Sequence, residues 1–92
     1  MLVKLIKISE PSSNLRSNVS EVYINTDHII SINNAPPEKA TTLITEAKQL
    51  GIMNPTISSV IISEGNRTNS IYVLGNPREI YNKINKSKLL KG

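Results

Sequence analysis

Residues 59–80, SVIISEGNRTNSIYVLGNPREI, carry the local signals that decide the expected fold. The apolar, β-branched runs 59–63 and 70–74 predict two strands. The polar residues 64–69 between them, which include a glycine, predict a hairpin turn. This stretch therefore predicts an antiparallel β-hairpin, followed at once by the start of a helix.

The start of that helix has the strongest local signal in the chain. Asn76 is a preferred N-cap residue, Pro77 suits the first helical position, and Glu79 is placed to bond back to the cap. This is a capping-box arrangement with asparagine as the cap. The sequence predicts a helix that runs through Ile84, and through Leu90 if it continues.

The N-terminal third of the chain predicts three further strands, at residues 2–8, 21–25 and 29–32, where β-branched residues recur. The polar, proline-broken residues 11–18 predict a mobile hairpin loop. Proteolytic nicking concentrates at such loop tips.

A second helix is predicted over residues 36–50. Two prolines open it, and proline is tolerated in the first helical turn. Gly51 is suited to follow its end. Apolar residues at helical spacing form one stripe, which predicts a core-facing side: Ala40, Leu43, Ile44, Ala47 and Leu50.

The predicted element order is β-β-β-α-β-β-α. It indicates an α+β fold, with a five-stranded, mainly antiparallel sheet and two helices, and a partly closed barrel as an alternative. The 92 residues suit a single domain over 1–92, and no linker divides them.

Alternation along the strands assigns the apolar residues to two sheet faces. One set is expected to form the core: Ile6, Ile8, Val22, Ile24, Ile30, Ile32, Val60, Ile62, Ile71 and Val73. The opposite set is also apolar: Val3, Leu5, Tyr23, Ile29, Ile61, Tyr72 and Leu74. Because monomers rarely expose large apolar patches, this second set is expected to form the interface of a homodimer or higher homo-oligomer.

The positive charge is concentrated at the C-terminus. The net charge is +4, and residues 1–82 contain as many basic as acidic residues. The excess comes from Lys83, Lys86, Lys88 and Lys91, so residues 85–92 are expected to form a basic tail. A nucleic-acid-binding regulator that uses these lysines and the strand tyrosines Tyr23 and Tyr72 is the alternative function.

Enzymatic and metal chemistry have little support. The chain has no cysteine and one histidine, which excludes disulfides, thiolate metal sites and cysteine nucleophiles. Its glycines are isolated, and no phosphate loop or catalytic motif occurs. Asp27 is expected to be a turn or cap residue, and His28 a structural or exposed one beside the turn. The sequence predicts no catalytic residue, metal or cofactor.

The first residues predict a strand and lack the features of a signal peptide, and no run of apolar residues is long enough for a membrane span. A cytoplasmic location without membrane insertion is therefore expected. Heavy use of Ile, Asn, Lys and Ser is typical of AT-rich bacterial or phage genomes.

Three segments in order resemble the small flagellar and swarming-motility proteins of the FlbD type. They are residues 2–8, the stretch VYINTDHIISI at 22–32 and the final hairpin and helix within 57–84. A long first loop and the helix at 36–50 depart from that pattern. The resemblance carries no catalytic residues and implies a small accessory protein that acts through contacts. We therefore expect a non-enzymatic accessory protein that binds another protein or a ligand, as a homo-oligomer.

Overall fold

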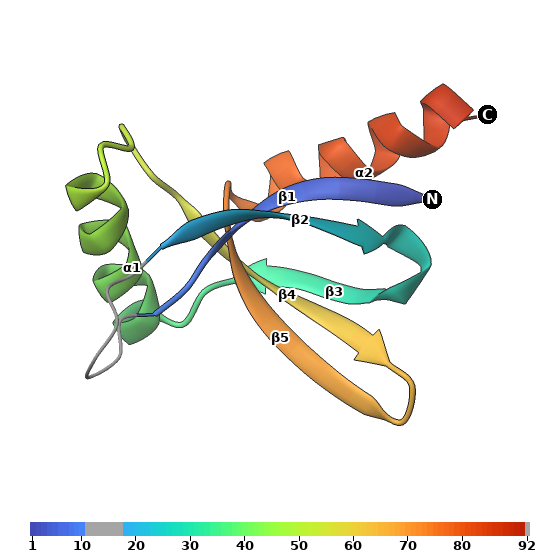
Figure 1. The fold of residues 1–92 in the computed structure, drawn as a ribbon, viewed down its shortest axis with the longest axis horizontal. Coiled ribbons are helices and arrows are strands. Elements are labelled where there is room, and N and C mark those ends of the chain that lie inside the picture. The colour runs from blue at the N-terminus through green and yellow to red at the C-terminus, as the bar shows by residue number, and fades with distance from the viewer. Residues whose placement is uncertain (11–17, 92) are drawn as a thin grey trace.

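The computed structural model describes residues 1–10 and 18–91, with side chains up to residue 86, and shows an α+β fold (Figure 1). The elements in order are β1 (Leu2–Ile8), β2 (Val19–Asn25), the 3₁₀ turn η1 (Thr26–His28), β3 (Ile29–Asn34), α1 (Pro37–Gln49), β4 (Ile57–Glu64), β5 (Arg67–Leu74) and α2 (Pro77–Lys91). The predicted order and fold class are confirmed. The predicted mobile loop at 11–18 falls almost entirely outside the described residues.

The five strands form one antiparallel sheet in the order β2-β1-β5-β4-β3. β1 and β5 pair at a single position, Lys7 opposite Val73, so the β1–β2 hairpin and the β3–β4–β5 meander join at a narrow seam. β2 and β3 are opposite edges of the sheet, yet only the three residues of η1 connect them. The sheet must therefore curl until these two edges meet at η1, but it does not close into a barrel.

The final hairpin is longer than the sequence predicts. Glu64 pairs with Arg67, so the turn consists of Gly65 and Asn66 alone. Gly65 adopts φ +64°, a left-handed conformation that glycine accepts without steric cost. The polar residues 67–69, predicted as turn, extend β5 because antiparallel pairing with β4 satisfies their backbone groups.

Helix α2 covers the inner face of the curled sheet. Its Ile80 and Ile84 pack with Val3, Leu5 and Val73, all of which are buried. Burial of such side chains contributes roughly 1.5–3 kcal/mol each. This cluster forms the main core of the molecule.

Helix α1 packs against the opposite face, at one end of the sheet. Leu43 and Ala47 are buried there with Ile8 and Ile57, as the predicted stripe requires. Leu50 is 47% exposed, so its predicted place in the core is wrong. The reason is that α1 ends at Gln49 and Leu50 is its C-cap, beyond the last turn that faces the sheet.

The predicted assignment of apolar side chains to the two faces of the sheet is partly wrong. Leu5 pairs with Val22, and Val3 pairs with Ile24, which places Val3 and Leu5 on the inner face beneath α2. Ile29 pairs with Ile62 and packs against the same core. By the same alternation Ile6 and Ile8 lie on the outer face. Both faces of these strands are apolar, so alternation within one strand does not show which face lies in the core. The pairing register between strands decides which face it is.

The joint between β5 and α2 is held by Gly75. Its φ is +115°, and a Cβ at this position would lie 3.0 Å from Ile80 Cδ1. The Gly75 N–H donates to Thr56 O at 2.8 Å, and the buried Ser58 hydroxyl donates to Gly75 O at 2.6 Å. These two bonds tie the start of α2 to the chain around the beginning of β4.

The predicted capping box is confirmed. The Glu79 N–H donates to Asn76 Oδ1 at 2.9 Å, and the Asn76 N–H donates to Glu79 Oε1 at 3.5 Å. From this cap α2 continues as far as Lys91. The backbone of the predicted basic tail, from residue 85 to Lys91, is therefore helical.

Candidate binding groove

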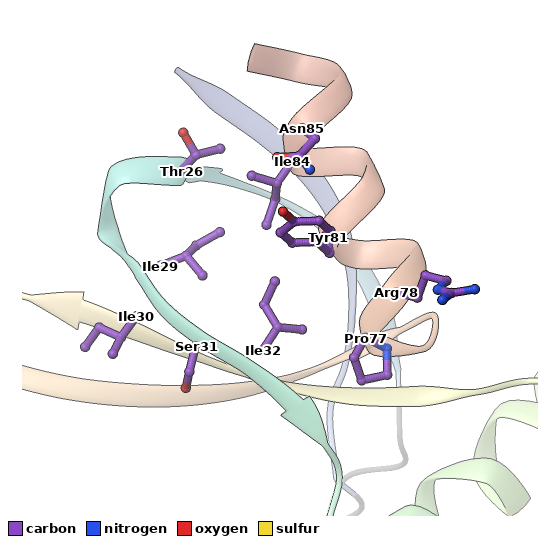
Figure 2. Close-up of a pocket in the computed structure, with 10 residues that line it drawn as sticks. All are labelled: Thr26, Ile29, Ile30, Ser31, Ile32, Pro77, Arg78, Tyr81, Ile84 and Asn85. Atoms are coloured by element: carbon purple, nitrogen blue, oxygen red, sulfur yellow. The ribbon is translucent and has the colours of Figure 1, made fainter. Parts of the chain in front are cut away.

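An open groove with a volume of about 520 Å³ lies between α2 and the edge strand β3. Figure 2 shows its lining side chains. They come from η1, β3 and α2: Thr26, Ile29, Ile30, Ser31, Ile32, Pro77, Arg78, Tyr81, Ile84 and Asn85. Its volume lies within the range of roughly 300–1,000 Å³ that is usual for ligand pockets.

Apolar and polar side chains share the walls of the groove. Ile29 and Ile32 extend from β3 toward α2, and Tyr81 and Ile84 extend from α2 toward β3 (Figure 2). Tyr81 is 58% exposed, whereas Ile84 is buried at the base. The groove therefore combines a buried apolar floor with an exposed aromatic ring on one wall.

The groove has a direction, because α2 runs opposite to β3. Pro77, at the start of α2, lies near Ile32, and Asn85 lies near Thr26 at the other end (Figure 2). Along β3 the pairing register with β4 shifts between Ile29 and Ser31. Such a bulge redirects side chains, and Ile30 is 56% exposed, pointing away from α2 (Figure 2).

Arg78 is the one charged residue among those that line the groove, and no acidic side chain lines it. Its guanidinium extends away from β3, at the rim (Figure 2). Arg78 forms no salt bridge with the residues that the structure describes. Arg78 therefore places a positive charge beside the start of α2 that does not point into the groove.

The ion pairs in the described part of the chain lie elsewhere. Lys4 Nζ is 3.2 Å from Glu21 Oε2, and Lys39 Nζ is 3.0 Å from Glu10 Oε2. In each pair the hydrogen bond to the carboxylate, followed by its charge, raises the pKa of the lysine above its usual value. Both pairs are exposed to solvent, and such pairs contribute little to stability.

Asp27 and His28 are exposed on η1 and form no evident catalytic arrangement with each other. The Asp27 N–H donates to Asn25 Oδ1 at 3.0 Å, the turn geometry that the sequence indicates. His28 borders a separate hollow, together with Tyr23 and Glu64. No group of three or more His, Asp or Glu side chains gathers within the described residues.

The seven residues predicted as an oligomer interface do not form one surface. Val3 and Leu5 are buried in the core, and Ile29 faces the groove. Tyr72 and Leu74 pack against the cluster beneath α1. Tyr72, Leu74 and Ile61 are each half-buried, and Tyr23, which is 64% exposed, is the one fully exposed member of the set.

The residues of the nucleic-acid alternative are also divided. Lys83 and Lys86 are exposed on α2, over the inner face, and the side chains of Lys88 and Lys91 lie beyond the described ones. Tyr23 and Tyr72 alternate with inner-face residues and therefore belong to the outer face. The fold does not bring the tyrosines and these two lysines together.

The sequence prediction did not anticipate the groove. On the helix, one usable signal was available, because Pro77, Tyr81 and Ile84 share one side at spacings of four and three residues. On the strand, Ile29 and Ile32 share a face only because of the bulge at Ile30. No sequence pattern revealed that bulge.

In the comparisons with known proteins, no family model, no curated protein and no solved structure matches the chain. Among the described residues, no helix is both long enough and apolar enough to span a membrane.

Proposed function

We propose that this protein is a small, non-enzymatic binding protein that recognises a partner through the groove between α2 and β3. The observation that carries this proposal is the exposed Tyr81 over a floor of isoleucines, within an open groove of about 520 Å³. Aromatic side chains of this kind, with an apolar ring and a polar hydroxyl, are enriched at protein interfaces.

The chemistry of the lining residues supports binding over catalysis. A general acid or base must lie within hydrogen-bond reach of a reacting group. The lining residues of the groove include no carboxylate, histidine or lysine, and the one charged side chain among them is that of Arg78. Arginine stays protonated at ordinary pH, so it can hold an anion but does not shuttle protons.

The proposal is tested by selecting, from a phage-displayed library of random peptides, those that bind the whole protein. We expect enriched peptides that bind the unmodified chain and lose at least ten-fold in affinity on Tyr81→Arg. The matched control is Tyr23→Arg, which adds the same charge at a similarly exposed tyrosine on the outer face. Equal binding to both variants, or no enrichment at all, would contradict a binding role for the groove.

A further inference from the structure

We infer that helix α1 is a displaceable cover, which undocks from the sheet together with its flanking residues, 36–54 in all, while the rest of the fold stays intact. Undocking exposes an apolar surface on the outer face, away from the groove. Three features of α1 support this inference: its place in the chain, the few bonds that attach it, and its dependence on packing.

The first feature is the place of α1 in the chain. Asn34, at the end of β3, pairs with Ser58 near the start of β4, so the chain leaves the sheet and returns to it at one point. Between these two residues, all of which the structure describes, only α1 and its connections intervene before β4 begins. Residues 36–54 can therefore leave without breaking any strand pairing. Ala35 and Pro55, both buried, mark the two ends of the moving segment.

The second feature is how α1 is attached. Within the described chain, a single hydrogen bond joins residues 36–54 to the remainder, from Lys39 Nζ to Glu10 Oε2 at 3.0 Å. Both side chains are exposed, and such a pair contributes little to stability. The segment is therefore held mainly by apolar contact. Leu43 and Ala47 are its buried helical residues, and alanine has little surface to bury.

The third feature is the weak start of the helix. The N-cap of α1 is Pro36, and no side chain caps the first turn. The hydroxyls of Thr41 and Thr42 donate to Pro37 O and Glu38 O within the helix, a bond that does not support helix formation. A helix of 13 residues is marginal in water by itself. Helix α1 therefore forms only while it is docked, so docking and folding of this segment are one cooperative step.

Undocking uncovers the apolar residues beneath α1. Ile8 and Ile57 are buried there, and Tyr72 and Leu74 pack against them. These residues belong to β1, β4 and β5, whose pairing with their neighbours does not involve α1. The cluster beneath α2 shares no buried residue with this one, so it stays packed. Helix α1 thereby controls access to one end of the outer face.

Native-state hydrogen exchange in low concentrations of urea tests this inference. The protected amides of α1 (Pro37–Gln49) should exchange through one common opening, at least ten-fold faster than the slowest amides of β4 (Ile57–Glu64) after correction for intrinsic rates. That opening should depend less on urea than global unfolding does, because it exposes less surface. Exchange of α1 at the rate set by global unfolding would overturn the inference.

A mutation in the other cluster separates local from global opening. Ile62→Val removes one methylene group from the core beneath α2 and should speed exchange of the slowest strand amides about two- to ten-fold. The amides of α1 should not respond, because Ile62 stays packed when α1 undocks. An equal acceleration in α1 would show that this helix opens only when the whole protein unfolds.

The two exposed ion pairs provide a matched comparison. Lys39→Gln removes the pair that attaches α1 and should speed exchange of α1 about two- to five-fold. Lys4→Gln removes the pair with Glu21 between β1 and β2, which stays formed when α1 undocks. It should therefore leave exchange of α1 unchanged. Equal effects of the two variants on α1 would contradict local undocking.

Thiol labelling measures the exposure of the surface itself, since the chain has no cysteine of its own. Ile8→Cys places a thiol beneath α1, and Val73→Cys places one on the inner face, at positions that are 1% and 0% exposed. The thiol at position 8 should react at least ten-fold faster, with the urea dependence found for exchange of α1. Equal labelling rates at the two positions would show that α1 does not uncover this surface.

Discussion

Two buried polar residues, Thr26 and Ser58, differ in how their hydroxyls are satisfied. The Ser58 hydroxyl donates to Gly75 O at 2.6 Å, and this bond holds the joint between β5 and α2. Thr26 is also buried, but its Oγ1 has no hydrogen-bond partner among the described residues. A buried polar atom without a partner costs about 1–3 kcal/mol, so one hydroxyl stabilises the fold and the other opposes it.

We predict that Thr26→Val keeps or raises the free energy of unfolding, by about 1 kcal/mol, because valine preserves the shape and removes the unpaired hydroxyl. Ser58→Ala should lower it, since Gly75 O then loses its buried donor. Urea unfolding of both variants measures the two effects. A clear loss of stability in Thr26→Val would mean that a partner for the hydroxyl forms in solution.

At the scale of the element, the helices differ in how far local sequence explains them. The Asn76–Glu79 capping box joins residues three apart, so its geometry follows from the local sequence alone. The stripe of α1 predicts correctly that Leu43 faces the core. It cannot show where the sheet ends, and for that reason Leu50 is exposed although it continues the same pattern.

These two leucines make a matched pair for mutation. Leu43→Ala should lower the free energy of unfolding by about 2–5 kcal/mol, the usual cost of a cavity in a packed core. Leu50→Ala should change it by about 0.5 kcal/mol or less, as is usual for an exposed side chain. Thermal unfolding of both variants provides the comparison. Similar melting temperatures for the two would show that α1 is not packed on the sheet in solution.

At the scale of the whole molecule, the outer face of the sheet is only partly covered. The extents of 41 × 31 × 21 Å describe a flattened body with helix α1 over only one end of the outer face.

We predict on this basis that the protein self-associates through the outer face. Light scattering at ~100 µM, where even a weak dimer with a micromolar Kd is populated, should give at least twice the monomer mass of 10.2 kDa. Tyr23→Asp should reduce that mass to the monomer value, because Tyr23 is the most exposed apolar side chain of that face within the predicted interface. The control is Tyr81→Asp on the other side of the sheet. A monomer mass for the unmodified protein would refute self-association, although the groove would remain available to another partner.

The sequence by itself determined the features that depend on neighbours a few residues apart. These include the element order, the cap of α2, the buried side of α1 and the turn role of Asp27. Tertiary structure decided which face each strand presents. Successive side chains of a strand point to opposite faces, so a shift of one residue in pairing moves a whole set to the other side. The pairing of Leu5 with Val22, and the bulge beside Ile30, join segments far apart in the chain. These pairings determine which side chains form the core and the groove, and they separate the residues of the predicted interface. Because both faces of these strands are apolar, no local sequence pattern predicts them.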